Sequence, residues 1–452
     1  MTSDSLVSQL HECFKASYDV DFSSPQRLFD AQRNLLEYVM RLGRDLEAAM
    51  FEDMGNGYEG PRVEKEGKQY RFIDHRPNSV HGLFGMIEYR RAYYVDGQGG
   101  SYTPLDERLG IEKKHTPGLN YFMSSFTGRE AYEGSLRWFH EIFRPDGRDM
   151  VSERKALDMD YELGDRLESK RQQEIEAVYE RQESMEKERV IEGVVAVSID
   201  ATKVRVKEGE EVTEDGRKRY EIGFRDVKVG VVSEVLWDEV RSEAYCRNSS
   251  YVSGMEHADK FFPRMTVEMQ RRCEDGSKQK IVFLADGATW IWDRIPDLGK
   301  ENSVFVLDFF HATEHVSKLC KELYGEQTEE YWRHFSRWKH LLLKGGVLKF
   351  IKELKKIRDG ESRKSKGDLL QGQINYFEQY KDMMRYDVYL AERLPIGSGT
   401  VESCCKNVIG GRLKQGGMTW SEPGAKGMSQ IRSSLASDRF TTDFRETLKN
   451  VA

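Results

Sequence analysis

Residues 193–200 read GVVAVSID, an apolar run that ends in an aspartate, and residues 280–286 read KIVFLAD, a second run of the same form. Short runs of Val, Ile, Ala and Phe are typical of buried strands. Functional side chains gather at the carboxyl edge of a parallel or mixed sheet. We therefore expect Asp200 and Asp286 to end two strands and to lie close together at one sheet edge.

A third acidic residue, Glu402, lies in LPIGSGTVES at residues 394–403, where a helix is expected to begin. Together the three carboxylates form an all-oxygen ligand set that suits Mg²⁺ or Mn²⁺ rather than zinc. A pair of such ions can activate a water and stabilise the leaving oxygen of a phosphodiester. The pattern therefore indicates metal-dependent chemistry on nucleic acid.

Each acidic residue also has an ordinary explanation. An aspartate at a strand end often caps the following turn, and a glutamate in a first helical turn is favoured by the helix dipole. Gly287, directly after Asp286, favours the functional interpretation because it leaves room for a bulky ligand. It is the combination of three acidic residues that predicts a site.

The periodicity of the chain predicts an α+β or α/β protein built around a mixed sheet. A polar, lysine-rich loop is expected after Asp200, and residues 220–235, YEIGFRDVKVGVVSEV, predict at least one further strand. From there strands alternate with helices, and residues 310–390 are helical in pattern. We interpret this helical stretch as an insertion into the sheet domain.

The N-terminal part is expected to be helical with a small β region. Residues 24–51 predict an amphipathic helix with a serine cap and Pro25 in its first turn, and residues 70–96 predict a hairpin. Residues 121–143 and 149–189 predict helices that could form a helix-turn-helix around RPDGRD. The expected segments are 1–115 (N-terminal helix and β region), 116–190 (helical), 191–325 (sheet core, first part), 326–390 (helical insertion) and 391–452 (sheet core, second part with the Glu402 helix and a C-terminal tail).

Composition sets limits on the setting. The chain has 452 residues, enough for several domains. No apolar run approaches the roughly 20 residues that cross a bilayer, and the N-terminus lacks the features of a signal peptide. Six scattered cysteines without a CxxC pair indicate a reduced, cytoplasmic protein without membrane partners.

The charge is unevenly distributed. The net charge is −7, but residues 332–369 hold 12 Lys/Arg against 4 Asp/Glu, a local balance of 12 − 4 = +8. A polyanion responds to the local field, so this segment could bind phosphates. A solvated face of charged helices is an equal alternative. Its candidate DNA contacts are Lys355, Lys356 and Arg358.

Further candidates lie near the acidic residues. Asp308 and His311 in LDFFHATEH could orient a metal ligand, or could be a helix cap and a surface imidazole. Trp290 could stack on an unpaired base, or pack in the core. Three basic residues follow Glu402 beside glycine-rich backbone that a phosphate chain can approach: Lys406, Arg412 and Lys414.

Four stretches together resemble a bacterial insertion-sequence transposase of the DDE type, most closely the ISKra-type family, which is related to Mutator-like transposases. They are SIDATKV (198–204), FLADGATWIW (283–292), LDFFHATEHV (307–316) and LPIGSGTVESCCKNVIGGRLKQGGMTWS (394–421). The resemblance covers about residues 190–440. It implies a ribonuclease H-like fold with Asp200, Asp286 and Glu402 as the catalytic, metal-binding triad. Asp308 and His311 resemble the Asp-x-x-His element of Mutator-like enzymes.

This resemblance implies an enzyme that cuts the terminal inverted repeats of its element and joins them to target DNA. It also implies Mg²⁺ or Mn²⁺ as cofactor, at least a dimer on DNA, and association with the bacterial nucleoid. Residues 90–110 are similar to a family segment that usually forms a zinc ribbon, but residues 96–99 read DGQG in place of a cysteine pair. Zinc is therefore not expected.

Two rival functions remain open. The first is a domesticated, transposase-derived protein that binds DNA without cutting it, although the intact triad argues against it. The second is a nuclease of the same fold that hydrolyses DNA without strand transfer.

Overall fold

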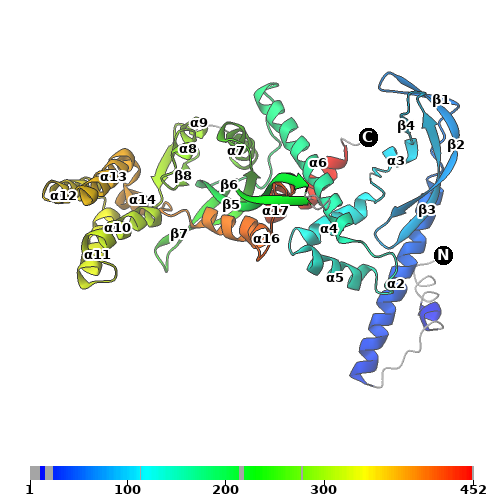
Figure 1. Ribbon diagram of the computed structural model, residues 1–452, viewed down its shortest axis with the longest axis horizontal. Helices are drawn as coiled ribbons and strands as arrows, with labels where there is room; N and C mark the ends of the chain where they lie inside the picture. Colours follow the sequence, from blue (N-terminus) through cyan, green and yellow to red (C-terminus); the bar gives the residue numbers. More distant parts are fainter. Residues whose placement is uncertain (1–10, 16–23, 112, 213–217, 276–277, 450–452) are drawn as a thin grey trace. The chain divides into compact units, whose positions relative to one another are not determined.

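The computed structural model describes residues 11–15, 24–111, 113–212, 218–275 and 278–449, and its ribbon is drawn in Figure 1. The protein is a mixed α+β structure with two sheets. The chain divides into two compact units, Met1–Leu167 with Thr441–Ala452, and Glu168–Phe440. Among the described residues, no helix is both long and apolar enough to cross a membrane.

The first unit combines a long helix with an antiparallel sheet. The predicted N-terminal helix is α2 (Pro25–Asp53), and the side chain of Ser24 caps it as expected. The predicted hairpin is also present, in a sheet of order β1-β2-β3-β4. Its strands are β1 (Arg62–Lys65), β2 (Lys68–His81), β3 (Met86–Val95) and β4 (Ser101–Tyr102).

The other helices of this unit differ from the prediction in their boundaries. They are α3 (Pro104–Arg108), α4 (Pro117–Thr127), α5 (Tyr132–Phe143), α6 (Glu153–Tyr179), which runs on into the second unit, and α18 (Phe440–Lys449). Residues 121–143 belong to two helices, because the chain turns at residues 128–131. RPDGRD connects α5 to α6, and α6 ends ten residues before the predicted end at 189.

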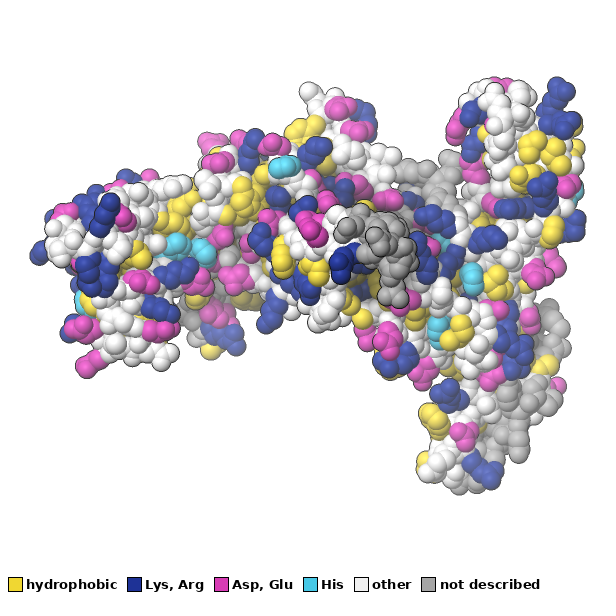
Figure 2. All heavy atoms as spheres, in the orientation of Figure 1, with side chains coloured by type: hydrophobic (Ala, Val, Ile, Leu, Met, Phe, Trp, Pro, Cys, Tyr) yellow, Lys and Arg dark blue, Asp and Glu magenta, His cyan; other side chains and the backbone are white. Residues whose placement is uncertain are grey.

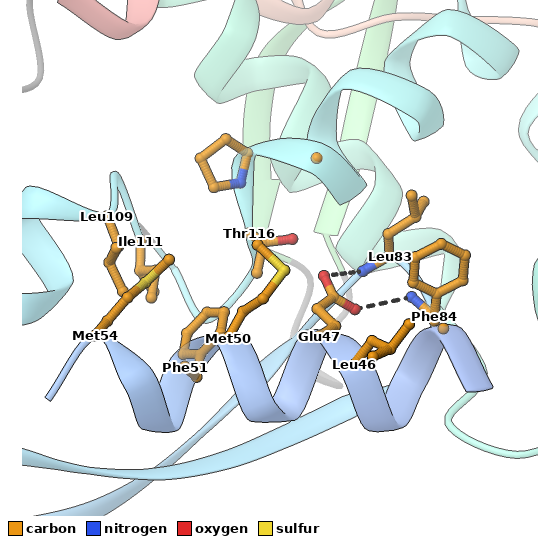
Figure 3. Close-up of a pocket in the computed structure, with 13 residues that line it drawn as sticks. Leu46, Glu47, Met50, Phe51, Met54, Leu83, Phe84, Leu109, Ile111 and Thr116 are labelled. Carbon is orange, nitrogen blue, oxygen red and sulfur yellow. Dashed lines mark hydrogen bonds between the residues drawn. The ribbon is translucent and has the colours of Figure 1, made fainter. Parts of the chain in front are cut away.

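An apolar cavity of about 480 Å³ lies beside α2 in the first unit (Figure 3). Leu46, Met50 and Met54 of α2 line it together with the loop residues Leu83 and Phe84. The carboxylate of Glu47 accepts hydrogen bonds from the backbone N–H groups of both loop residues, at 3.0 and 3.1 Å. The only titratable group in its lining is thus occupied in holding the loop.

The second unit is built on a five-stranded mixed sheet of order β7-β6-β5-β8-β9. Its strands are β5 (Val195–Val212), β6 (Lys218–Asp238), β7 (Glu243–Gly254), β8 (Ile281–Ala285) and β9 (Ser303–Leu307). β5, β6 and β7 pair antiparallel, whereas β8 pairs parallel with β5 and β9 pairs parallel with β8. Every residue of β8 is buried, as its continuous apolar run predicts.

The strand that carries Asp200 is longer than predicted. No loop follows Asp200, because β5 continues to Val212 and pairs with β6 along its length. The expected polar loop is a strand whose alternating residues, Val204 and Val206, are buried. What ends near Asp200 is the pairing with β8, whose last pair is Ser198 with Leu284.

Helices cover both faces of this sheet (Figure 1). On one face Met265 of α7 (Ala258–Arg272) packs so closely on Gly230 that a Cβ would meet its sulfur. On the other face Ser433 of α17 (Glu422–Ala436) donates a hydrogen bond to Ser253 at 2.9 Å. The remaining short helices are α8 (Thr289–Trp292), α9 (Ile295–Leu298), α15 (Gly399–Cys404), the π-helical η2 (Cys405–Gly410) and α16 (Gly411–Leu413).

The stretch between β9 and α15 is helical, as predicted. It contains α10 (Phe309–Tyr324), α11 (Glu329–Leu343), α12 (Val347–Asp359), α13 (Lys364–Tyr380), η1 (Lys381–Met383) and α14 (Tyr386–Ala391). These helices share one hydrophobic core with the sheet. The hydroxyl of Tyr386 donates to the backbone oxygen of Leu307 at 3.0 Å, which fixes the inserted helices to β9.

Candidate active site

A cavity of about 160 Å³ lies beside the sheet of the second unit and is rich in carboxylates. Asp200 reaches it from β5, Asp286 from the residue after β8, and Glu402 from the first turn of α15. The structure thus brings together three acidic residues that lie far apart in the sequence. The cavity is lined by Ile199, Asp200, Asp286, His311, Glu314, Ser398, Val401 and Glu402.

Asp200 is held by its neighbours in the middle of β5. Its Oδ1 accepts a hydrogen bond from the N–H of Ala201 at 2.6 Å, and the thiol of Cys405 lies 3.5 Å from its Oδ2. Burial raises the pKa of the Asp200 carboxyl above its usual value, and the negative charges of Asp286 and Glu402 raise it further. The cavity therefore concentrates negative charge that a cation would neutralise.

Asp286 follows β8 directly, and its Oδ1 accepts a hydrogen bond from the N–H of Ala288 at 2.9 Å. The glycine after it has a different purpose from the one predicted. A Cβ on Gly287 would clash with the ring of Tyr376, and the hydroxyl of Tyr380 donates to the backbone oxygen of Gly287 at 3.0 Å. The missing side chain of Gly287 therefore makes room for Tyr376 of α13 rather than for a ligand.

Glu402 is connected to Asp308 through Ser398. Asp308 is fully buried, and its Oδ2 accepts hydrogen bonds from both the backbone N–H and the hydroxyl of Ser398. The Ser398 Oγ also lies 3.1 Å from Oε1 of Glu402. Asp308 does not line the cavity, but it holds the serine that contacts one of the three carboxylates. Sequence reasoning missed Ser398.

His311 lies in the first turn of α10 and lines the cavity. The backbone N–H of His311 donates a hydrogen bond to Oδ1 of Asp308 at 2.7 Å, so Asp308 also caps this helix. A fourth carboxylate, Glu314, lines the same cavity, with Oε2 3.7 Å from Nδ1 of His311. The i, i+3 spacing of the two residues in LDFFHATEH could have indicated Glu314, because such residues share a helix face.

Both tryptophans near Asp286 take part in packing. Trp292 is buried, and its Nε1 donates to the backbone oxygen of Asp286. The half-buried Trp290 packs edge-on against Phe262, with ring centroids 6.4 Å apart, and Nζ of Lys228 lies 5.6 Å from its ring. Neither tryptophan lines the cavity, and the packing interpretation fits both.

The three basic residues after Glu402 lie in different surroundings. Lys414 is exposed, and its Nζ donates to the hydroxyl of Thr202, two residues beyond Asp200 on β5. Lys406 is exposed on η2. Arg412 is fully buried with its guanidinium 4.8 Å from the centre of the Trp420 ring. The prediction that Arg412 contacts DNA is therefore wrong.

The basic residues of α12 lie outside the cavity lining. Lys355 forms an ion pair with Glu378 at 2.5 Å, and Arg358 donates to Oδ1 of its neighbour Asp359. Lys356 is exposed. On the face that Figure 2 shows, Lys and Arg side chains of the helical region are interspersed with Asp and Glu. The local excess of positive charge is thus partly neutralised.

The cavity suits a divalent cation by its chemistry. Its carboxylates offer oxygen ligands, and burial together with the charges of Asp286 and Glu402 raises the pKa of Asp200. As the side chains lie, however, no three His, Cys, Asp or Glu residues in the described part of the chain are close enough together to hold one ion.

The chain was compared with known proteins. The model of an uncharacterised protein family, UPF0236, matches residues 28–446. A UPF0236 protein of Caldanaerobacter subterraneus subsp. tengcongensis is 25% identical over 404 residues, which are 88% of this chain and 75% of the relative. Two others from the same strain are 22% identical. One matches over 419 residues, which are 88% of this chain and 76% of the relative, and the other over 415 residues, which are 88% of this chain and 75% of the relative. The curated name of the first joins eleven locus designations, and that of the third joins four.

Proposed function

The chain belongs to the uncharacterised protein family UPF0236, and we propose that it is a DNA transposase of the DDE type. In this proposal it cuts the ends of an insertion sequence and joins them to target DNA. The observation that carries the proposal is the convergence of Asp200, Asp286 and Glu402, from three separate elements, on one cavity.

The architecture of the second unit supports the proposal. A mixed sheet with three antiparallel strands followed by two parallel ones agrees with the ribonuclease H-like core that the sequence resemblance implies. The helical insertion lies between Asp286 and Glu402. Glu402 nevertheless reaches the cavity, because Ser398 returns the chain to Asp308 at the end of the insertion.

The relatives give independent support. A curated name that joins eleven locus designations describes a protein encoded many times in one genome. Repeated copies are what an element leaves when it is moved by the enzyme it encodes. The multiplicity belongs to those relatives, and we extend its explanation to this chain as part of the proposal.

The proposed reaction has two steps at one site. Water adds to the phosphorus at an element end, and the departing 3′-oxygen takes up a proton; the freed 3′-hydroxyl then attacks a target phosphorus and displaces a second 3′-oxygen. Bound Mg²⁺ or Mn²⁺, held by Asp200, Asp286 and Glu402, would activate the attacking oxygen and stabilise the leaving one. Ser398 would hold Glu402 in position, and Lys414 would hold a flanking phosphate. Since two ends must be cut together, we propose at least a dimer on DNA.

The proposal is tested with a DNA duplex that carries the inverted repeats flanking the gene. Labelled ends are incubated with protein and Mg²⁺ or Mn²⁺, with EDTA, and with the Asp286→Asn variant as control. We expect new 3′-hydroxyl ends and strand-transfer products only with wild-type protein and metal. Cutting without transfer would support a nuclease instead, and binding without cutting would support the non-enzymatic alternative.

A further inference from the structure

The sheet of the second unit extends into a two-stranded ribbon that the proposed chemistry does not use. Pairing of β5 with β8 ends at Ser198, and pairing of β6 with β7 begins at Lys228. Residues 202–208 and 221–227 therefore pair only with each other within the described sheet, apart from a bridge between Val206 and Trp420. Such a ribbon has two faces, and the residues on each follow from the register.

One face of this ribbon is packed. Val204 and Val206 are buried on it, and the backbone of Trp420 pairs with the strand beside Val206 through two hydrogen bonds of 2.7 and 3.1 Å. Acidic groups are also neutralised on this side, because Glu208 forms an ion pair with Arg225. This face belongs to the interior of the unit.

The opposite face is bare and alternates cations with apolar side chains. Lys203, Arg205 and Lys207 occupy alternate positions of β5 and are exposed. Directly across from the second and third of them, on β6, lie Phe224 and Ile222. Phe224 is 57% exposed and Ile222 is 51% exposed.

A third apolar group continues this row. Tyr220 is 36% exposed, and Nζ of Lys207 lies 5.1 Å from its ring centre. The only acidic residue paired across this face between Lys203 and Lys207 is Asp226, which forms an ion pair with Lys203 at 3.1 Å. Between Lys203 and Lys207 the face therefore carries three cations against one carboxylate, on a chain whose total charge is −7.

We propose that this face, hereafter the ribbon face, binds an unpaired DNA strand. Aromatic side chains stack on bases regardless of sequence, and adjacent cations bind the phosphates. Exposed rings on a positively charged strand pair provide both contacts. A protein partner would match the apolar groups but would leave a row of cations without anionic partners.

The ribbon face and Asp200 lie on opposite sides of β5. Asp200 is an even number of residues from the buried Val204 and Val206 and shares their side, whereas Lys203 and Lys207 occupy the alternate positions. A DNA strand bound to the ribbon face is therefore held on the side of the sheet away from the Asp200 carboxylate. The inference rests on the proposed function, since it assumes that the protein acts on DNA.

The test measures binding separately from cutting. Fluorescence anisotropy of labelled single-stranded and duplex oligonucleotides is recorded for Phe224→Ala, for Ile222→Ala, and for a triple variant with Lys203→Gln, Arg205→Gln and Lys207→Gln. Tyr245→Ala is the matched control, because this exposed aromatic residue (45%) lies on β7 of the same sheet. Thermal melting of each variant checks that the fold is intact.

We expect Phe224→Ala to weaken single-strand binding by about 5- to 100-fold and duplex binding much less. The triple variant should flatten the log–log salt slope for single strands by about 2, at roughly 0.7 per lost phosphate contact. Tyr245→Ala should bind as wild type does.

Three outcomes would contradict the inference. Wild-type affinity of the ribbon variants in a protein that still cuts its DNA would overturn the ribbon assignment and leave the proposed function in place. If the ribbon variants lose equal affinity for duplex and single-stranded DNA, the preference for an unpaired strand would be overturned. A wild-type protein that neither binds nor cuts DNA would overturn both proposals.

Discussion

Asp308 and Ser398 lie 90 positions apart, yet one carboxylate oxygen of Asp308 accepts hydrogen bonds from both the backbone N–H and the hydroxyl of Ser398. The other oxygen caps α10. The inserted helices therefore leave the sheet and return to it at the same fully buried carboxylate. Because the Ser398 hydroxyl also contacts Glu402, the closure of the insertion and the position of a candidate ligand are one structural feature.

This relationship predicts that Ser398 positions Glu402. Ser398→Ala should slow DNA cleavage by about 10- to 100-fold, the range typical of residues that orient metal ligands. Ser398→Thr, which keeps the hydroxyl, should restore most of the rate. Single-turnover cleavage rates are measured over a range of Mg²⁺ concentrations.

A neighbouring serine supplies the control for this experiment. Ser403 is exposed on α15, next to Glu402, so Ser403→Ala should leave the rate unchanged. Alanine at Asp308 or His311 should slow cleavage by a similar factor, because Asp308 accepts hydrogen bonds from both Ser398 and the backbone of His311. If Ser398→Ala cuts as fast as wild type, the serine has no positioning role.

The carboxylates themselves should be essential for cutting but not for folding. Asp200→Asn, Asp286→Asn and Glu402→Gln are each expected to abolish strand cleavage, since loss of one ligand removes several kcal/mol of transition-state stabilisation. DNA affinity and melting temperature should stay close to wild type. Wild-type cutting by any of the three variants would remove that residue from the site.

The basic residues after Glu402 should separate into two classes. Lys414→Gln should weaken DNA binding and lower the salt slope by roughly 0.9 on duplex DNA, because this exposed lysine reaches β5 beside Asp200. Arg412→Gln should lower the melting temperature instead, because its buried guanidinium lies against Trp420. Binding isotherms and thermal melts are recorded for both variants. A lower melting temperature for Lys414→Gln with weaker DNA binding only for Arg412→Gln would contradict the prediction.

Much of the second unit follows from local sequence. The buried strand β8 and the residue Asp286 after it could be predicted because a short apolar run with one polar end has few alternatives. The extension of β5 beyond Asp200 could not be predicted in this way. Its outer half alternates Val with Lys and Arg, a pattern that resembles a charged loop until the pairing with β6 is known.

Contacts between segments that are distant in the sequence also could not be predicted. Arg412 was expected on the surface because arginine beside glycines is typical of phosphate contacts, and only the fold reveals Trp420 beneath it. The small size of Gly287 correctly indicated a close approach, but the approaching group is Tyr376 from the insertion. Ser398 shows the same limit, since its partner Asp308 lies at the other end of the inserted helices.

The second unit should lose stability in acid through a buried ion cluster. Burial alone would raise the pKa of Glu268, but the charges of Arg439 and Arg271 outweigh it and lower the pKa to about 2. Glu168 behaves in the same way beside Arg264 and Lys426, with a pKa of about 2. Both carboxylates therefore stay ionised in the folded protein at pH values where the unfolded chain takes up protons.

The sign of the effect follows from these lowered values. Each glutamate stabilises the fold fully above its unfolded pKa of about 4.3 and loses that contribution as the pH falls toward 2, by up to about 1.4 kcal/mol per pH unit and group. Urea unfolding between pH 2 and 7 should show this slope. Glu268→Gln should flatten it and lower stability at pH 7 by roughly 3–5 kcal/mol, because two arginines lose their buried partner. Glu239→Gln, which removes an exposed pair with Arg393, should do neither, and an equal effect of both variants would show that the buried cluster is not the cause.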